Sequence, residues 1–425
     1  MKFRIRAYSA RGWRAAFALV PFFWLNGCDD ATGPSAPAGD EFIAFSSVST
    51  VNDHACGVAL DGRGWCWGAN RFGVLGDGTA VELRMRPVEV AGGHRWSAIS
   101  THWRHSCGLT VEGKAYCWGG RQYGALGDGR IGTEQEIALA PVEVSGGHRF
   151  TEIAVGGAFA CALDAGGQAW CWGKGMDGEL GVLPIPPADC ETLYDGMKPC
   201  TAVPLAAAGD LRFRSIEVGS FNACGVTPGG EAWCWGSNGT MNLATDTIRG
   251  CPTWYVACSH VPVRIPLPGE VRSVAVGDFT NCALVEDAAW CWGHGLRPLG
   301  IGQHDWESQD CFNGLGFCVP TPLPVVGGHR FRSLVVAGLG ACGLDEAGRA
   351  WCWGDAPGIA DAWEPTRVRG AQRFELLDGR DGFACGLTAE GRAWCWGDAA
   401  SSVMSVPPGT DPGGPIPVAM PEVGP

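Results

Sequence analysis

One motif recurs seven times along the chain and constrains its fold more than any other feature. Each copy has a short run containing a cysteine, a turn rich in Gly or Asp, and a second short run ending in Cys-Trp-Gly, as in ACGVALDGRGWCWG at residues 55–68. Short alternating runs bounded by turn residues are typical of β-hairpins. A chain with seven copies of one hairpin is a repeat protein.

The two cysteines of each hairpin are predicted to form a disulfide across the strands. They lie ten residues apart in six copies and nine apart in one. Directly opposed residues of an antiparallel pair are roughly 4.5–5.5 Å apart, which suits a disulfide. The two alternatives are a metal site and free thiols. Zinc sites usually use cysteines two to four residues apart, and free thiols suit a reducing compartment. The predicted pairs are Cys56 with Cys66, Cys107 with Cys117, Cys161 with Cys171, Cys224 with Cys234, Cys282 with Cys291, Cys342 with Cys352, and Cys385 with Cys395.

The first 27 residues are predicted to be a lipoprotein signal peptide. Five basic residues precede an apolar stretch at residues 15–25, which is too short to cross a bilayer as a helix. The segment ends Leu25-Asn26-Gly27-Cys28, which resembles a bacterial lipobox, although a small apolar residue is usual at position 26. An ordinary secretory signal is the alternative.

Lipid attachment at Cys28 also accounts for the odd number of cysteines. The chain has 21, and the other 20 fall into local pairs. Residues 28–41 are rich in Gly, Pro, Ala and Ser and are predicted to form a flexible tether. We therefore expect an exported protein, anchored by lipid to the bacterial cell envelope at its periplasmic face or cell surface.

Residues 42–425 are predicted to form an all-β, seven-bladed β-propeller of four-stranded antiparallel blades. Each repeat has four short apolar segments, and equivalent first cysteines lie 43 to 63 residues apart. The last segment of each repeat begins with proline, which belongs at sheet edges. Seven blades can close into a ring, although the sequence leaves open how the chain ends meet.

The hairpin at residues 54–68, followed by the Gly-Leu-Gly type segment at 73–78, resembles the regulator of chromosome condensation repeat. The resemblance implies a seven-bladed propeller that serves as an interaction platform. The histidine of the family pattern is present at His54 and His105. Other residues replace it elsewhere, namely Phe159, Asn222, Thr280, Gly340 and Phe383.

The charge of the chain argues against a nucleic-acid partner. The full chain carries −13, and the first 27 residues contribute five basic and no acidic residues, so the remainder carries −18. A surface of this charge repels phosphate backbones.

Three long insertions between hairpin and Pro-led segment are the predicted partner-binding loops. They span residues 182–203, 237–261 and 302–320 in blades 3–5, and each has its own cysteine pair. These pairs are Cys190 with Cys200, Cys251 with Cys258, and Cys311 with Cys318. Disulfides lower the entropy that loops lose on ordering, and aromatic side chains often dominate recognition. The aromatic candidates are Tyr194, Trp254, Tyr255, Trp306, Phe312 and Phe317.

The alternative for these aromatics is packing in small local cores beneath the loops. The tryptophans of the repeats are instead predicted to pack between blades, namely Trp65, Trp67, Trp118, Trp170, Trp172 and their equivalents. No catalytic or phosphate-binding motif is present, and His105 of the close pair His102 and His105 occupies the histidine position of the repeat. We therefore predict no enzyme activity, no metal and no cofactor.

The predicted function is binding by a monomeric propeller that recognises a protein or glycan partner. Two alternatives remain: a periplasmic enzyme of hydrolase or lyase type with its site at the central channel, and a purely structural envelope component. Clustered buried His, Asp or Glu at the axis would favour the enzyme. Exposed aromatics on the insertions would favour binding.

Overall fold

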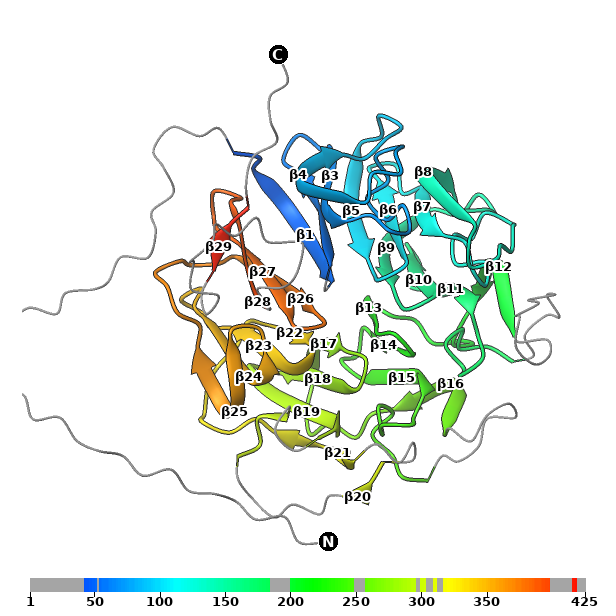
Figure 1. Cartoon of the computed structure of the whole chain (residues 1–425). Coiled ribbons are helices and arrows are strands. Elements are labelled where there is room, and N and C mark those ends of the chain that lie inside the picture. Colours follow the sequence, from blue (N-terminus) through cyan, green and yellow to red (C-terminus); the bar gives the residue numbers. More distant parts are fainter. Residues whose placement is uncertain are drawn as a thin grey trace, which may run out of the picture. The chain divides into compact units, whose positions relative to one another are not determined.

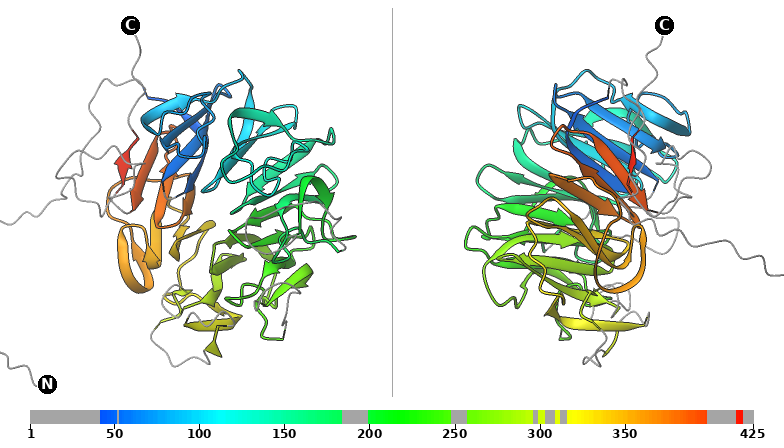
Figure 2. Two further views of the ribbon diagram at one scale, coloured as in Figure 1. Left: turned by 45° about the vertical axis from the view of Figure 1, so that its right-hand side comes forward. Right: turned by 90° about the vertical axis from the view of Figure 1, so that its left-hand side faces the viewer.

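A computed structural model of the chain describes residues 42–51, 53–183, 199–247, 257–295, 299–302, 309–311, 316–397 and 415–418. Every named element in these ranges is a β-strand, and the strands form seven antiparallel sheets. The sheets stand as blades around a central axis (Figure 1). Views from two other sides show the same ring of sheets (Figure 2). The predicted seven-bladed propeller is confirmed.

Each blade consists of four consecutive strands, numbered here from the axis outward. The first strands are β1 (Phe45–Val51), β5 (Trp96–Thr101), β9 (Phe150–Val155), β13 (Ser215–Val218), β17 (Val271–Val276), β22 (Ser333–Ala337) and β26 (Leu376–Arg380). The second strands are β2 (His54–Ala59), β6 (His105–Thr110), β10 (Phe159–Asp164), β14 (Asn222–Val226), β18 (Thr280–Val285), β23 (Leu339–Leu344) and β27 (Phe383–Leu387).

The hairpin partners and the outer edges complete the blades. The third strands are β3 (Gly64–Ala69), β7 (Ala115–Gly120), β11 (Ala169–Lys174), β15 (Ala232–Ser237), β19 (Ala288–His294), β24 (Ala350–Ala356) and β28 (Ala393–Gly397). The fourth strands are β4 (Leu83–Glu89), β8 (Ile137–Glu143), β12 (Cys200–Ala206), β16 (Cys258–Arg264), β21 (Phe317–Pro324), β25 (Ile359–Arg367) and β29 (Ile416–Pro417).

The fourth strands contain the prolines that the sequence placed at blade edges, for example Pro87 in β4 and Pro141 in β8. Proline has no N–H to offer a neighbouring chain, so it protects an exposed edge from further pairing. Blade 5 differs from the four-stranded prediction in one respect. A short strand β20 (Gln309–Asp310) from its insertion pairs with β21 and makes this sheet five-stranded.

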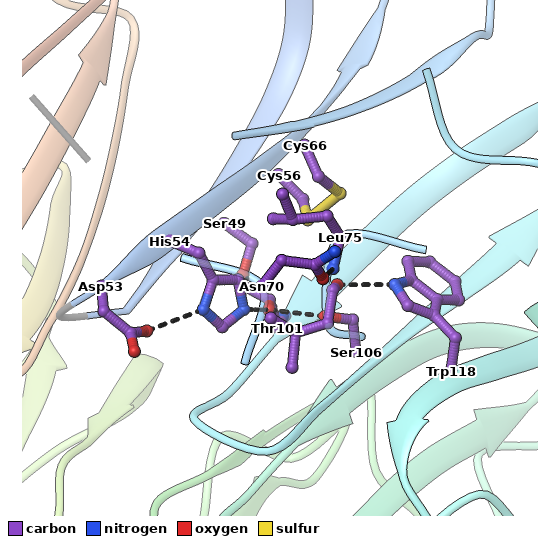
Figure 3. Close-up of a disulfide and its surroundings, with 11 residues drawn as sticks. Ser49, Asp53, His54, Cys56, Cys66, Asn70, Leu75, Thr101, Ser106 and Trp118 are labelled. Carbon is purple, nitrogen blue, oxygen red and sulfur yellow. Dashed lines mark hydrogen bonds and ion pairs between the residues drawn. A yellow bond between two sulfur atoms is a disulfide. The ribbon is translucent and has the colours of Figure 1, made fainter. Parts of the chain in front are cut away.

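The predicted disulfides join the second and third strands of all seven blades. The two cysteines face each other directly in the strand register, with Cα atoms 4.0–4.1 Å apart. All fourteen cysteines are at most 2% exposed. Figure 3 shows Cys56 and Cys66 in blade 1. The symmetric spacing about the turn is the reason, because it places both cysteines on one face of the hairpin.

The second tryptophan of each hairpin packs between blades, as predicted. All seven are fully buried. Trp118 Nε1 of blade 2 donates a hydrogen bond to the Val74 carbonyl of blade 1 at 2.7 Å. Trp172 and Trp235 make the same bond to the preceding blade, to the carbonyls of Ala125 and Glu179. Each of these three rings thus fills the space between two sheets and satisfies its own N–H there. Among the described residues, Nε1 of Trp67, Trp353 and Trp396 has no hydrogen-bond partner.

The Leu-Gly segment that follows the early hairpins is the other half of this junction. Leu75 is fully buried, and Gly76 has φ of 65°. A Cβ atom on Gly76 would lie 2.7 Å from Trp118 Nε1 of the next blade. Glycine at position 76 therefore suits both the backbone conformation and the close approach of the indole ring.

Ring closure uses the same contacts as every other junction. The Phe45 amide of blade 1 donates to the Gly391 carbonyl of blade 7 at 2.9 Å. The equivalent bond between blades 1 and 2 joins the Trp96 amide to the Gly62 carbonyl at 2.8 Å. Blades 1 and 7 each contain only consecutive strands. The seven sequence repeats therefore coincide with the seven blades, and within the described residues no strand from one chain end enters the blade of the other.

Candidate functional site

The loops that join the strands divide between the two ends of the propeller. Because neighbouring strands are antiparallel, the turns from first to second strand and the loops from third to fourth strand lie at one end, which we call the loop face. In blade 2, Arg104 of the first kind of turn donates to Gln122 of the second kind of loop at 2.5 Å. We call the first kind the axial turns; they contain residues 53, 102–104, 156–158, 219–221, 277–279, 338 and 381–382.

The three insertions reach their fourth strands at equivalent positions on the loop face. Cys200 pairs with Lys174 in the strand register of blade 3, and Cys258 pairs with Ser237 in blade 4. Cys318 takes the same position in blade 5. The insertions occupy the same place in successive repeats, so they join their fourth strands on the same face.

One of the predicted partner-binding aromatics lies in the described part of the chain. Phe317 begins β21, and its side chain is 56% exposed. It therefore faces solvent beside the disulfide of Cys311 and Cys318. The remaining candidates lie outside the described residues, namely Tyr194, Trp254, Tyr255, Trp306 and Phe312.

The insertion disulfides are described in part. Cys311 and Cys318 are bonded and pack with Met241 of blade 4, so the insertion of blade 5 contacts its neighbour. Cys200 and Cys258 are also disulfide-bonded. Their predicted partners Cys190 and Cys251 lie outside the described residues, as does the predicted lipid carrier Cys28.

A polar cavity of about 80 Å³ lies along the axis of the propeller. It has room for a few water molecules. Its lining comes from the first strands of six blades. The polar and acidic lining residues include Ser49, Thr50, Ser100, Thr101, Glu217 and Asp378. Arg380 crosses the axis from blade 7, and its Nη2 donates to the Val218 carbonyl of blade 4 at 2.7 Å.

Glu217 and Asp378 line this cavity, Glu152 lies near Glu217, and burial raises the pKa of all three carboxyls. The pKa of Glu217 rises to about 8, with the Glu152 carboxylate as the second cause. The Glu217 side chain is exposed to the axial cavity, and the surrounding blades separate it from bulk solvent. Burial raises the pKa of Asp378, while hydrogen bonds from Thr50 N (2.6 Å) and Oγ1 (2.8 Å) oppose this rise. Glu152 accepts a bond from the Ile216 amide at 3.2 Å.

The two histidines of the close pair, His102 and His105, are both buried. His102 accepts a hydrogen bond from the Trp103 amide at Nδ1, 2.8 Å away, and its Nε2 lies 3.1 Å from Ser220 Oγ of blade 4. Burial, followed by the charge of Arg380, holds the pKa of His102 well below its usual range. Burial also lowers the pKa of His105 to about 3. Both histidines are therefore neutral at physiological pH.

The histidine of the first repeat links blade 1 to blade 2. His54 Nδ1 lies 2.9 Å from Asp53 Oδ1, and its Nε2 lies 2.5 Å from Thr101 Oγ1 (Figure 3). Thr101 is bonded in turn to Ser106, which donates to the Val74 carbonyl. This Asp-His-hydroxyl line resembles the geometry of a nucleophile relay. Because Thr101 is 2% exposed and Ser106 is fully buried, the line joins blades and offers no hydroxyl to a substrate.

The described residues contain no group of three or more His, Cys, Asp or Glu side chains that could hold a metal ion. Across the same ranges, no helix has the length and apolarity to cross a membrane.

The axial carboxyls and Arg380 were not singled out by the sequence analysis. A signal was present, because Glu217, Asp378 and Arg380 stand in first strands where most repeats have small or apolar residues. Their convergence depends on the ring, which brings residues more than 160 positions apart to one axis, as for Arg380 and Val218.

Comparison with known proteins identifies the repeats. The regulator of chromosome condensation (RCC1) repeat matches residues 61–109, 112–163, 150–179 and 213–240. The mitochondrial RCC1 domain-containing protein RUG3 of Arabidopsis thaliana is 26% identical over 310 residues, covering 71% of this chain and 63% of RUG3. The ultraviolet-B receptor UVR8 of the same plant is 25% identical over 232 residues, covering 54% of this chain and 50% of UVR8. The chain thus spans between half and two thirds of the length of these relatives.

The solved structures agree on the fold. Prp20p from Saccharomyces cerevisiae matches with a TM-score of 0.64 and 22% identity, covering 79% of this chain and 80% of that one. At this identity the likeness shows the fold alone. The matched residues are therefore repeats of the regulator of chromosome condensation type, as the sequence resemblance implied.

Proposed function

We propose that this protein acts by binding, and that the loop face with the insertions of blades 3–5 recognises a protein or glycan partner. The observation behind the proposal is the equivalent position of the three insertions, each of which enters its fourth strand at or beside a disulfide-bonded cysteine. Loops tied down in this way lose less entropy on binding than free loops. Prp20p, a propeller of the same fold, has been studied for its binding to Gsp1p and histones.

The proposal includes export and attachment of a monomeric propeller to the bacterial cell envelope through lipid on Cys28. The support comes from the sequence of the first 28 residues and from the disulfides, which persist in oxidising compartments. Replacing Cys28 by Ser should release the protein from the membrane fraction into the soluble one. A Cys28→Ser variant that fractionates like the wild type would defeat the lipid anchor.

The binding role is tested on the insertions. Alanine at Trp254, Tyr255 and Trp306 together should abolish capture of the partner from envelope extracts, and the melting temperature should change little. The exposed apolar residue Leu60, at the opposite end of blade 1, supplies a control substitution. A large fall in melting temperature for the triple variant would place these aromatics in a local core and remove them from the binding surface.

The axial carboxyl cluster favours a second candidate function, a hydrolase or lyase acting at the central channel. Glu217 is the residue of interest, because its raised pKa keeps it protonated at neutral pH, as a general acid requires. The other polar groups of the cluster are engaged by their neighbours, as with Asp378 and Thr50. Loss of a hydrolytic activity on envelope material in Glu217→Gln, with binding unchanged, would support this candidate over the first.

A further inference from the structure

The first strand of each blade presents one main-chain edge to the axis. In an antiparallel pair, every second residue directs its N–H and its C=O away from the partner strand. One such residue lies opposite the residue that precedes the first hairpin cysteine, in all seven blades. Its amide needs an acceptor from outside its own blade.

In blades 1–3, a polar side chain of the preceding blade is that acceptor. All three acceptors occupy one repeat position, immediately before the axis-facing amide of their own strand. The bonds run from Thr50 N to Asp378 Oδ2 at 2.6 Å, from Thr101 N to Ser49 Oγ at 3.0 Å, and from Val155 N to Ser100 Oγ at 3.1 Å. They link blade 7 to blade 1, blade 1 to blade 2, and blade 2 to blade 3.

In blades 4–7, the equivalent amides have no such acceptor. They belong to Val218, Val276, Val336 and Gly379. The acceptor position of the preceding blades is occupied by Ala154, Glu217, Ala275 and Val335. Three of these side chains have no polar atom, and Glu217 makes no hydrogen bond within the described part of the chain. This part of the axis therefore offers main-chain amides and a carboxyl that the described residues leave unpaired.

These groups border the axial cavity, whose lining includes Glu217, Val336 and Gly379. The pKa of about 8 keeps the Glu217 carboxyl uncharged at neutral pH, so it can both donate and accept a hydrogen bond. Ser49 and Ser100 line the same cavity from blades 1 and 2. Each serine oxygen already accepts an amide, so the hydroxyl hydrogen is available for a second bond.

The charges around the cavity are balanced. Asp378 is the other carboxyl of the lining, and the charge of Arg380 opposes the rise of its pKa. Arg380 donates to the carbonyls of Val155 and Val218, at 3.5 and 2.7 Å, so the axis-facing residues also direct carbonyls inward. With Glu217 uncharged, the cavity favours an uncharged ligand whose polar groups both donate and accept.

The volume of the cavity limits the ligand to a small molecule. One water needs about 10–15 Å³ on the scale that gives the cavity about 80 Å³. By the same measure, the cavity holds roughly five to eight non-hydrogen atoms. Hydroxyl groups both donate and accept, so a short polyol meets the requirements of size, charge and hydrogen bonding together.

The exposure of the first strands indicates where such a ligand enters. Beside the axial turns, Val51, His102 and Ala337 are at most 2% exposed, and Arg380 crosses the axis. On the other side of the cavity the first strands are less covered. The serines there are half-buried, namely Ser47, Ser215, Ser273 and Ser333. Solvent thus reaches the axis from the end opposite the loop face.

We propose that the axial cavity binds a small uncharged polyol of about three or four carbon atoms. Its hydroxyl groups pair with the Val336 and Gly379 main chain, with Ser49 and Ser100, and with the Glu217 carboxyl. The site is separate from the loop face and does not require catalysis in the channel. It also stays accessible when a partner covers the loop face, because the ligand enters from the other end.

The test is saturation-transfer NMR on the purified full chain, with glycerol, erythritol and sorbitol as probes. Glycerol and erythritol fit the cavity, so both should receive saturation from the protein. Sorbitol is too large and should receive none. Leucine fills most of the space of glutamate but forms no hydrogen bond, so Glu217→Leu should bind glycerol at least tenfold more weakly than the wild type.

The matched control is Glu82→Leu, at an exposed glutamate, which should bind glycerol like the wild type. Melting temperatures show whether both variants fold, and the comparison with sorbitol decides the question in the wild type alone. Absence of transfer to glycerol and erythritol, equal transfer to sorbitol, or wild-type affinity in Glu217→Leu would overturn the site. None of these results bears on binding at the loop face, because the measurement uses no partner.

Discussion

At the scale of single residues, the interior of this propeller combines apolar packing between blades with charge along the axis. The tryptophans of the hairpins pack where the repeat pattern predicted. The axial carboxyls depart from the repeat pattern, but a lone Glu217 in a short strand gives no hint that Glu152 and Arg380 lie near it. The histidine position of the repeat was equally hard to interpret from the sequence. His54 is bonded to Thr101 of the next blade, whereas burial keeps His105 neutral.

The raised pKa of Glu217 predicts a specific pH dependence of stability. Its pKa is about 8 in the folded protein against an ordinary value of 4.5, so between these values the folded chain holds a proton that the unfolded chain releases. The free energy of unfolding should therefore fall as the pH rises through this window. Glutamine cannot release a proton, so Glu217→Gln should lose less stability than the wild type between pH 5 and pH 8.5.

Urea unfolding at the two pH values measures this difference, and Glu82→Gln, at an exposed glutamate, is the control. An identical pH dependence in the wild type and in Glu217→Gln would show that Glu217 ionises normally.

At the scale of elements, the hairpin is the unit that the sequence specified most completely. Its alternation fixed the strands, and its cysteine spacing fixed the register and all seven disulfides. The Leu-Gly segment was visible in the early repeats, but its partner was not. The structure shows that Leu75 and Gly76 pack on Trp118 of the next blade. Blade 4 keeps the arrangement with Leu243 and Ala244, where alanine adopts φ of 50°.

The close approach at Gly76 can be separated from its backbone conformation. Gly76 and Gly93 both have φ of 65°, but an added Cβ meets Trp118 at 2.7 Å only at position 76, and meets nothing within 4 Å at position 93. Gly93→Ala should cost about 1–2 kcal/mol from the left-handed conformation alone. Gly76→Ala should cost a further 1–3 kcal/mol or so, because overpacking displaces the indole ring.

Chemical denaturation of the two variants gives the comparison directly. Equal losses in Gly76→Ala and Gly93→Ala would mean that the indole ring yields without cost and that the blade junction is loosely packed.

At the scale of the whole molecule, side-chain and main-chain hydrogen bonds between blades 1 and 7 join the two ends of the ring. Thr50 of blade 1 donates two hydrogen bonds to Asp378 of blade 7, and Phe45 donates to Gly391. The sequence left this closure open, because contacts between residues over 320 positions apart have no local signature. Closure also creates the axial cavity.

Thr50→Val tests the closure between blades 1 and 7. The variant keeps the shape of the side chain but loses the Oγ1 bond to Asp378, and hydrogen bonds to charged groups contribute about 1.5–3 kcal/mol. The free energy of unfolding should fall by this amount, with Thr247→Val in an exposed loop as the control. A loss no larger than in the control would assign ring closure to apolar packing alone.

By itself, the sequence determined the number of blades, the strands of each hairpin, the disulfides within them and the repeat family. These follow from short-range patterns, since alternation, turn residues and cysteine spacing act within about a dozen residues. Only the tertiary structure decided which blade lies against which chain end and which charged residues meet at the axis. Those features depend on seven separate sheets closing around one axis, and residues far apart in the chain become neighbours only when the ring is complete.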